Sequence, residues 1–430
     1  MEAGKPNVAF AGLGAMGFGM ATNLLKCGYQ VTGYDVYQPT LDRFIAEGGK
    51  SASTPSKAAE DAEFFICMVV NAEQAGNVLF EKYTGACLTL PKEATILICS
   101  TVAPADIDVF HKKLERTGRT YLRLIDCPVS GGAARAADGL LSIFAAGKEA
   151  DLVHANQILE CMSSKLYKIP GGLGGGSKAK LIHQIFAGVN IAMASEAMGL
   201  AAAAGLNTQE AFDYLKYSDG NSWMFSNRVP HMLDPSLPPY SAINIIAKDV
   251  GIITSTARDW KFALPMLSMA EQLYTTAISA GWGKEDDCVM TRLYLPNRPD
   301  LVTEQVKSSK TSETPQLQFH DIKFLLIGVH VAVISEAMTF CEKLGIDTDI
   351  MFDIVSNAAG SSAMFSLMFK DMQKENWSLG ALHSTDLVRY QLSESVRKAN
   401  AIRYPVFLSS AALQEFYRQL STFVNTARIG

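Results

Sequence analysis

A short apolar segment that runs into closely spaced glycines constrains the fold of this chain more than any other feature. Residues 8–12 read VAFAG, and Gly12, Gly14 and Gly17 are followed by an apolar helical pattern. The next apolar segment, YQVTGYDV, carries Asp35 near its end. A strand, a glycine turn, a helix and a second strand ending in an acid form the arrangement that binds a dinucleotide. We therefore expect the first part of the chain to hold such a ligand.

Each residue of this turn has an expected role. Gly12 permits the tight turn, Gly14 lets the backbone approach the pyrophosphate, and Gly17 lets the helix pack closely on the strand. The carboxylate of Asp35 suits the ribose hydroxyls of the adenosine and repels a 2′-phosphate, so it favours NAD over NADP. The alternative is that Asp35 only caps the turn at the end of its strand. The predicted cofactor loop also contains the residues between the glycines: Leu13, Ala15 and Met16.

Further apolar segments alternate with helical patterns over residues 1–165. They lie at 63–70, at 94–100, and in a run that ends with LIDCPVS at 124–130. This alternation predicts a Rossmann fold, an α/β doubly wound parallel sheet. Ligands of such sheets bind at the carboxyl ends of the strands. We expect one crevice to be lined by the residues that follow the strands: Val70, Asn71, Ser100, Thr101 and Ser130.

A serine and two glycines end the last of these segments. The hydroxyl of Ser130 and the unencumbered backbone N–H groups of Gly131 and Gly132 can form a concavity for an anion. We expect this concavity to bind the carboxylate of a small substrate. The alternative is an ordinary glycine turn.

Four motifs follow one another in the order of a known family. They are AGLGAMG, CSTVAP with Thr101, DCPVSGGAARAADG at 126–139, and GGLGGGSKAK at 171–180. They resemble the motifs of the β-hydroxyacid dehydrogenases, the group of 3-hydroxyisobutyrate dehydrogenase and tartronate semialdehyde reductase. The segments at 180–198, 221–225, 247–251 and 283–287 resemble more closely the L-threonate dehydrogenase branch of that family.

The resemblance implies an activity and a set of site residues. It makes Lys180 the catalytic acid/base and places Lys248 and Asp249 at the site, with Lys248 also near the cofactor. Many members have Asn where this chain has Gln184, whereas the threonate-type branch shares the pair His183-Gln184. The implied reaction is NAD-linked oxidation of a hydroxyl group on a small acid, with an L-threonate-like sugar acid favoured. The alternatives are 3-hydroxyisobutyrate or tartronate semialdehyde chemistry, an imine reductase, or a protein that binds NAD without turnover.

The position of Lys180 suits acid/base chemistry. It is expected in the first turns of a long helix, and His183 and Gln184 share its face at i+3 and i+4. A lysine with its ordinary pKa of about 10.4 is a poor base near neutrality. We expect burial and the positive charge of NAD⁺ to lower that pKa. The alternatives are a solvated lysine, and a His183 that only packs between helices or supports the site from behind.

The helical pattern of residues 175–295 returns at 319–430, after a linker at 296–318 that is rich in Pro, Ser, Thr and charges. SEAM at 195–198 recurs at 335–338, 140 residues later, and other short motifs recur at the same offset. The chain is therefore predicted to be a Rossmann domain followed by two all-α domains.

The second helical domain lacks the expected chemistry. At the same offset Lys180 becomes His320 and Gln184 becomes Phe324, and the Lys-Asp pair becomes Thr385-Asp386 after a three-residue shift. We expect a structural copy that docks on the first domain as an intramolecular pseudo-dimer, with further oligomerisation open. The alternative is a second ligand site.

Composition restricts the remaining partners. The net charge of −5, without a basic run, gives no reason to expect nucleic acid or anionic lipid. The eight cysteines show no metal-ligand spacing, so we predict free buried thiols in a reducing compartment and no metal. The N-terminus has no signal peptide pattern, and the apolar stretch 181–205 is interrupted by polar residues, which predicts a buried helix rather than a membrane span. We therefore expect a cytoplasmic protein.

Overall fold

The computed structural model describes residues 5–307, 317–380 and 383–427. It divides the chain into two compact units, Met1–Lys180 and Leu181–Gly430. The predicted domain boundaries inside the second unit stay a prediction, because that unit contains both helical segments. We use "first helical segment" for residues 175–295 and "second helical segment" for residues 319–430.

The first unit contains the predicted doubly wound sheet. Its strand order is β3-β2-β1-β4-β5-β6, and every pair of neighbours is parallel. This is the strand order of a dinucleotide-binding Rossmann fold, so the expected fold class is confirmed. The strands are β1 (Asn7–Ala11), β2 (Gln30–Tyr34), β3 (Lys50–Ser51), β4 (Phe64–Cys67), β5 (Thr95–Ile98) and β6 (Arg123–Asp126).

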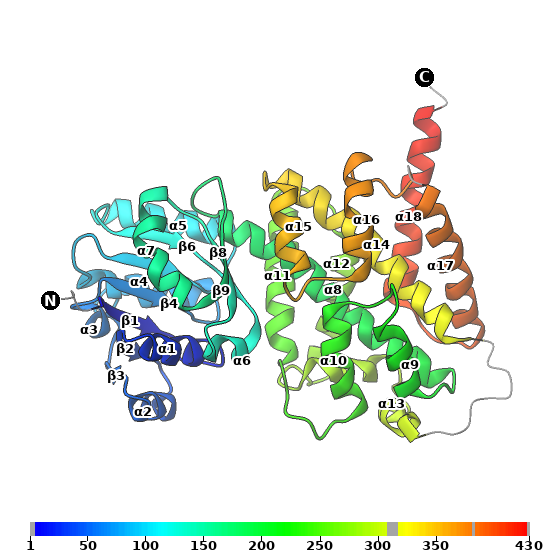
Figure 1. Cartoon of the computed structure of the whole chain (residues 1–430), viewed down its shortest axis with the longest axis horizontal. Coiled ribbons are helices and arrows are strands. Elements are labelled where there is room, and N and C mark those ends of the chain that lie inside the picture. The colour runs from blue at the N-terminus through cyan, green and yellow to red at the C-terminus, as the bar shows by residue number, and fades with distance from the viewer. Residues whose placement is uncertain (1–4, 308–316, 381–382, 428–430) are drawn as a thin grey trace. The chain divides into compact units, whose positions relative to one another are not determined.

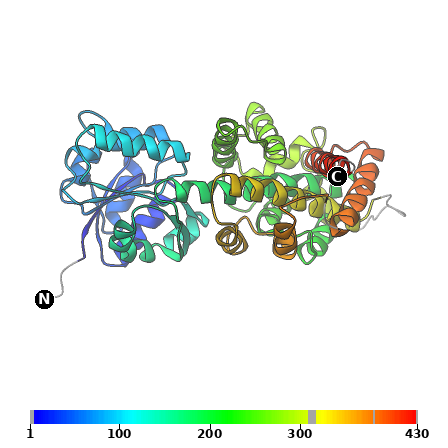
Figure 2. The ribbon, with the colours of Figure 1, turned by 90° about the horizontal axis from the view of Figure 1, so that it is seen from above.

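Helices cover both faces of this sheet (Figure 2). Alternate residues of β1 point to opposite faces: Val8 and Phe10 belong to one buried core, and Ala9 and Ala11 to another. The first core includes residues of α1 (Gly17–Lys26), α2 (Gln38–Ala46) and α7 (Glu149–Cys161). The second includes residues of α3 (Pro55–Ala59), α4 (Ala72–Phe80) and α5 (Pro104–Arg116). Burial on both faces explains why the strands read as continuous apolar runs.

A second, three-stranded sheet was not predicted. It consists of β7 (Val129–Ser130), β8 (Leu141–Ala145) and β9 (Ser163–Lys168), with α6 (Gly132–Ala137) between the first two. The sequence predicted one run to Ser130, but β6 ends at Asp126, two residues before Pro128. Proline has no N–H to continue a ladder. Ser130 therefore lies in the second sheet, paired with Ser142 of β8, and not at the end of a strand of the large sheet.

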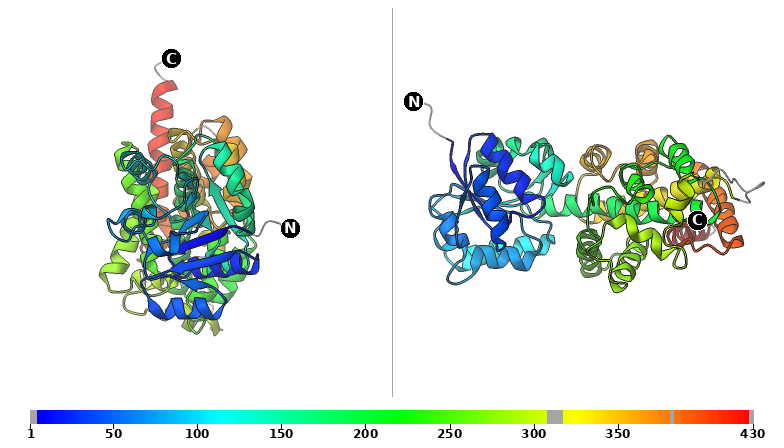
Figure 3. Two further views of the ribbon diagram at one scale, coloured as in Figure 1. Left: turned by 90° about the vertical axis from the view of Figure 1, so that its left-hand side faces the viewer. Right: turned by 90° about the horizontal axis from the view of Figure 1, so that it is seen from below.

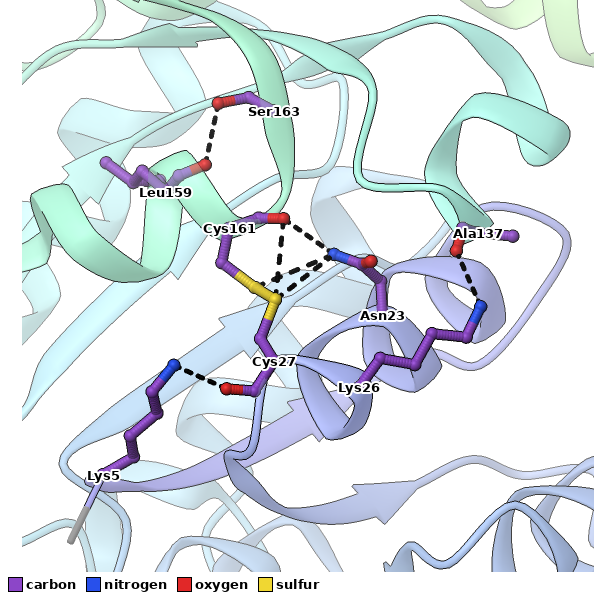
Figure 4. Close-up of a disulfide and its surroundings, with 8 residues drawn as sticks. All are labelled: Lys5, Asn23, Lys26, Cys27, Ala137, Leu159, Cys161 and Ser163. Atoms are coloured by element: carbon purple, nitrogen blue, oxygen red, sulfur yellow. Dashed lines mark hydrogen bonds between the residues drawn. A yellow bond between two sulfur atoms is a disulfide. The ribbon is translucent and has the colours of Figure 1, made fainter.

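Two of the eight cysteines differ from the expectation of free thiols. Cys27, which follows α1, and Cys161, the last residue of α7, form a disulfide, with their Cα atoms 6.7 Å apart (Figure 4). The prediction is wrong for this pair because 134 positions separate the two residues in sequence, and only the packing of α1 against α7 brings them together. The other six are free and buried: Cys67, Cys87, Cys99, Cys127, Cys288 and Cys341.

The second unit is helical in its described residues, as expected. The first helical segment has α8 (Gly175–Ala203), which begins in the first unit, α9 (Thr208–Lys216), α10 (Trp223–Leu233), α11 (Ile243–Asp259), α12 (Pro265–Ser279) and the 3₁₀ helix η2 (Asp287–Leu293). The second has α14 (Phe319–Lys343), α15 (Thr348–Ser356), α16 (Ala363–Lys374), α17 (His383–Ala401) and α18 (Phe407–Ala427). Each segment thus begins with a long helix, continues with two short helices and then has two helices of intermediate length. The last turns of α18 extend past the other helices of this unit (Figures 1 and 3).

In the part of the chain that the structure describes, two helices are long and apolar enough to cross a membrane, α8 and α14. The apolar window of α8 is 100% buried inside the protein and that of α14 is 89% buried. Such burial is typical of apolar helices at the centre of a large protein core.

The two helical segments contact each other through pairs of equivalent residues. The backbone N–H of Trp223 donates to the carbonyl of Ser361 over 2.9 Å, and the N–H of Ala363 donates to the carbonyl of Asn221 over 3.0 Å. Between them, Ser222 and Ser362 form an antiparallel bridge. Each donor and acceptor lies 140 residues from its counterpart, so these contacts are reciprocal.

Two buried glutamates extend this reciprocity. Glu196 of α8 accepts hydrogen bonds from the N–H groups of Leu408 and Ser409 in the first turn of α18, at 2.9 and 3.1 Å. Glu336 of α14 accepts from those of Met266 and Leu267 in the first turn of α12, at 2.7 and 3.0 Å. Each glutamate therefore caps a helix of the other segment, where free N–H groups and the helix dipole favour a negative charge.

The range predicted as a linker contains two short helices, α13 (Leu301–Glu304) and η3 (Gln305–Lys307). Leu301 and Val302 are buried, and the Thr208 hydroxyl donates to the carbonyl of Val302 over 2.7 Å. Apolar side chains within the polar stretch account for this order. Residues 308–316 of the predicted linker lie outside the described residues.

Candidate active site

The glycine turn after β1 has the geometry that a dinucleotide requires. Gly12 has a φ of +93°, and a Cβ there would lie 2.4 Å from the carbonyl oxygen of Met68. A Cβ at Gly17 would lie 1.9 Å from the carbonyl oxygen of Gly12, so helix and turn meet closely. A Cβ at Gly14 would have no heavy atom within 4 Å. Gly14 therefore faces open space, into which a pyrophosphate fits.

Asp35 follows β2 and faces this turn. Its Oδ2 accepts a hydrogen bond from the backbone N–H of Leu13 over 2.7 Å, and its Oδ1 accepts from the N–H of Tyr37 over 2.9 Å. The carboxylate thus caps the turn, which was the alternative interpretation. A carboxylate has about four lone-pair positions, so both oxygens keep capacity for ribose hydroxyls, and the two roles are compatible.

The other predicted cofactor residues of this unit follow the central strands. Val70 lies after β4 with 62% of its side chain exposed. Asn71 caps α4, its side-chain oxygen accepting from the N–H of Gln74 over 2.9 Å. Thr101 lies after β5, which is hydrogen-bonded to β4. Because β1, β4 and β5 are adjacent parallel strands, these residues and the glycine turn share one edge of the sheet.

Ser130, Gly131 and Gly132 form a turn between β7 and α6. Ser130 is buried, while Gly131 and Gly132 have φ values of +144° and +81°. L side chains rarely adopt such backbone conformations. A Cβ at Gly132 would meet nothing within 4 Å, so its backbone is open to a small anion. The sequence analysis expected an anion-binding turn here, but it placed the turn at the end of a strand of the large sheet instead of in the second sheet.

Asp126 was missed by the sequence analysis. It ends β6, is fully buried, and accepts from the backbone N–H and the hydroxyl of Ser177, both over 2.7 Å. Burial raises its pKa to about 7, although hydrogen bonds from Ser177, Gly174 and Gly176 oppose the rise. The carboxyl group therefore holds the first turn of α8 against the end of β6. An acid at the end of an apolar strand, with a glycine- and serine-rich helix start later in the chain, was the available signal.

Lys180 lies near the start of α8, and only 4% of the residue is exposed to solvent. This excludes the solvated lysine that was the alternative. His183 and Gln184 follow on the same face of the helix and are also buried, at 0% and 9% exposed. The helix therefore carries a cation, an imidazole and an amide on one buried face.

In the second unit, His183 and Gln184 belong to a hydrogen-bonded network. The Nδ1 atom of His183 lies 3.0 Å from the Oε1 of Gln184. The Nε2 of Gln184 donates to the Oδ2 of Asp249 on α11 over 2.6 Å. The Nζ of Lys248 lies 2.9 Å from the Oδ1 of Asp249. The four predicted residues of this unit are thus brought together.

The equivalent positions of the second helical segment form no such network among the described residues. His320 is exposed, and its ring lies 4.8 Å from that of Phe324. Thr385 is buried, and Asp386 pairs with Arg389 on the same helix over 2.8 Å. An imidazole beside a phenyl ring offers no acid/base pair.

Comparison with known proteins identifies the family. A family model described as the NAD binding domain of 6-phosphogluconate dehydrogenase matches residues 7–171. A second, described as the NAD-binding domain of NADP-dependent 3-hydroxyisobutyrate dehydrogenase, matches residues 174–294 and also 322–424. The chain belongs to the 3-hydroxyisobutyrate dehydrogenase family. It is an NAD-dependent hydroxyacid dehydrogenase, as the resemblance implied.

Individual relatives agree with this family. L-Threonate dehydrogenase of Cupriavidus necator is 38% identical over 288 residues, which are 67% of this chain and 96% of the relative. Mouse mitochondrial 3-hydroxyisobutyrate dehydrogenase is 33% identical over 66% of this chain and 85% of its own. The crystal structure of 3-hydroxyisobutyrate dehydrogenase from Salmonella typhimurium, 36% identical, covers 67% of this chain and 100% of its own with a TM-score of 0.62. About a third of this chain lies outside each of these alignments.

Proposed function

We propose that this enzyme oxidises a small hydroxy acid, an L-threonate-like sugar acid being favoured, with Lys180 as the general acid/base. The observation that carries the proposal is the buried helix face of Lys180, His183 and Gln184, tied to Asp249. Similarity to L-threonate dehydrogenases over two thirds of the chain supports the substrate class.

Each predicted site residue has a role in the proposed oxidation. Oxidation removes a hydride from the carbinol carbon and a proton from its hydroxyl oxygen. NAD supplies the hydride acceptor when it is bound. The Nζ of Lys180 takes the hydroxyl proton, the Ser130-Gly131-Gly132 turn binds the substrate carboxylate, and His183, Gln184, Lys248 and Asp249 hold the rest of the acid by hydrogen bonds.

The cofactor preference follows from Asp35. The open space at Gly14 and the spare lone pairs of Asp35 fit the pyrophosphate and the adenosine ribose of NAD. A 2′-phosphate beside this carboxylate would place like charges together. We propose that the cofactor also contacts the rest of the glycine loop, Val70, Asn71, Thr101 and Lys248.

A panel of acids tests the function. NADH formation is measured with L-threonate, D-erythronate, 3-hydroxyisobutyrate and glycerate, and the reverse reaction with tartronate semialdehyde, each with NAD(H) and NADP(H). The proposal predicts the highest kcat/KM for L-threonate with NAD. A cyclic imine is added to the panel as a substrate for reduction, and turnover of that imine alone would indicate the imine reductase alternative. Equal kcat/KM for both cofactors would contradict the role of Asp35.

We further propose that the second helical segment is a copy of the first and that the two form an intramolecular pseudo-dimer. The match of one family model to both stretches and the reciprocal contacts of Glu196 and Glu336 support this. A chain ending near residue 300 should expose the buried contact face and therefore dimerise or aggregate in light scattering. A soluble, fully active monomer of that length would contradict the proposal.

We propose a cytoplasmic location, which the burial of α8 and α14 inside the protein supports. In a reducing compartment the Cys27–Cys161 pair should be reduced. Alkylation of the protein in intact cells, followed by mass spectrometry, should then modify both cysteines. A disulfide that survives in cells would contradict this location.

A further inference from the structure

The second helical segment contacts the candidate active site of the first. The backbone N–H of Gly360, in the turn between α15 and α16, donates to the Nε2 of His183 over 3.1 Å. The carbonyl oxygen of the same residue accepts from the Nδ2 of Asn190, about two turns after His183 along the buried face of α8, over 3.5 Å. One glycine of the second segment thus meets α8 with both of its backbone polar groups.

This contact determines the direction of the hydrogen bonds in the network. An N–H group can only donate, so the Nε2 of His183 accepts and the ring proton resides on Nδ1. Nδ1 then donates to the Oε1 of Gln184, which orients the amide so that its Nε2 donates to Asp249. A single donor in the second segment therefore fixes the tautomer of His183 and, through it, the orientation of the Gln184 amide.

The close approach favours a glycine, because an added Cβ would make tighter contacts than most Cβ atoms do. A Cβ at position 360 would lie 3.1 Å from the carbonyl oxygen of His183, 3.2 Å from the Cβ of Phe186 and 3.3 Å from the Cδ2 of His183. The turn itself is held in place by the reciprocal hydrogen bonds of Trp223 and Ala363. Because that turn is anchored, a larger residue at 360 would displace the imidazole.

The equivalent contact, in which Gly220 of the first segment approaches α14 of the second, has similar steric contacts but no hydrogen bond to an imidazole. A Cβ at Gly220, 140 residues earlier, would lie 3.2 Å from the carbonyl oxygen of Lys323 and 3.3 Å from the Cβ of Leu326. Lys323 occupies the position of His183, and its ammonium group has no lone pair to accept a hydrogen bond. The sterics are thus repeated, whereas the hydrogen bond to a side chain is specific to His183.

We propose that Gly360 is a positioning residue of the active site: the second helical segment holds His183 in its Nδ1–H tautomer and thereby orients Gln184 and Asp249 toward the substrate. The segment therefore contributes to catalysis as well as to packing. This role rests on the proposed function for its effect on turnover, while the tautomer itself does not.

The test compares two glycine variants of the full chain, Gly360→Ala and Gly220→Ala. Both add one Cβ against the backbone of a long helix, so both should lower the melting temperature by similar amounts. Only Gly360→Ala should lower kcat for the accepted hydroxy acid, by roughly tenfold to a hundredfold as for a misplaced site group, with the KM for NAD unchanged. Equal kcat in the two variants would overturn the proposal.

The tautomer is read directly from the imidazole ¹⁵N spectrum of the full chain labelled at its seven histidines. The His183 signals are those lost in His183→Gln. The wild type and Gly220→Ala should show a protonated Nδ1 and an unprotonated Nε2, a pattern that Gly360→Ala should lose. A protonated Nε2 in the wild type would overturn the proposal even if Gly360→Ala fails to fold. If the wild type oxidises none of the acids, the proposed function fails, whereas this spectrum still decides the tautomer.

Discussion

The two helical segments share the order of their helices and differ in the chemistry of one helix face. Glu196 and Glu336 occupy equivalent positions, are both buried, and each caps a helix of the other segment. At the start of the same two helices, Lys180 is buried and His320 is exposed. Contacts between the segments are therefore retained on both sides, and the candidate catalytic group is present on one side.

The energetic cost of each change explains this difference. A glutamate that caps a buried helix end leaves backbone N–H groups without acceptors when it is lost, at a cost of about 1–3 kcal/mol for each unsatisfied group. An exposed residue such as His320 has no comparable contact to preserve. Packing residues are thus constrained in both segments, while an acid/base residue is constrained only where it meets a substrate.

After Lys180, the equivalent positions whose substitution should differ most in its effect on kcat/KM are two aspartates, Asp249 and Asp386. Asp249→Asn removes the carboxylate that accepts from Gln184 and pairs with Lys248. We expect kcat/KM for the hydroxy acid to fall about a hundredfold, because the amide it orients would lose its position. Asp386→Asn is the matched control, since this exposed residue forms an ion pair with Arg389 of its own helix. Equal losses in the two variants would contradict the assignment of the site to the first segment.

The two capping glutamates should both contribute to stability. In both, burial raises the pKa, that of Glu336 to about 8, while backbone hydrogen bonds oppose the rise. Above pH 8, where Glu336 is ionised, Glu196→Gln and Glu336→Gln should each lower the free energy of unfolding by about 2 kcal/mol, because an amide accepts only with its oxygen whereas a carboxylate accepts with both oxygens. Urea denaturation measures this. The exposed Glu210→Gln is the control, with an expected change below about 0.5 kcal/mol. A loss in only one of the two variants would show that the contacts are not energetically reciprocal.

A smaller effect is expected at His330, the residue of the second segment that is equivalent to Asn190 of the first. His330 is fully buried, and neither ring nitrogen has a hydrogen-bond partner among the described residues. Burial lowers its pKa from 6.5 to about 3. The unfolded chain therefore takes up a proton near pH 6.5 that the folded chain does not, and this contribution to stability is lost as the pH falls from 6.5 toward 3.

The measurement compares the wild type with His330→Leu. Between pH 7 and pH 5.5 the wild type should lose about 1 kcal/mol more of its free energy of unfolding than the variant does. The difference between the two proteins is used because Asp126, with a pKa raised to about 7, destabilises the folded state as the pH rises over part of the same range. Parallel pH profiles would show that His330 is not buried in its neutral form.

Much of the fold could be predicted because its signals are local. The glycine spacing 12, 14, 17, the apolar strands and Asp35 specify the Rossmann sheet within short stretches of sequence. Every strand of this sheet was expected within a few residues except the two-residue β3 at its edge, which the sequence analysis missed. The 140-residue repeat predicted the second set of helices. The second sheet was missed because β7 has only two residues and follows Pro128, too short for a periodic signal.

The candidate site was predictable only in part. Lys180, His183 and Gln184 share a helix face, which spacing alone reveals. The contacts of Asp126 with Ser177, of His183 with Gly360, and of Cys27 with Cys161 join residues 51, 177 and 134 positions apart. No local pattern encodes such pairs, so they required the tertiary structure.

One acid/base lysine, present in the first segment only, is expected to carry the chemistry of the whole chain. Steady-state oxidation of L-threonate by NAD⁺, or of the best acid of the panel, is measured for Lys180→Ala and for His320→Ala, with NADH binding followed by fluorescence. Lys180→Ala should lose about 10²–10⁴-fold in kcat and bind NADH nearly as the wild type does, because the glycine turn and Asp35 are intact. His320→Ala should be unchanged in both. Turnover of Lys180→Ala within a few-fold of the wild type, or a comparable loss in His320→Ala, would contradict the claim.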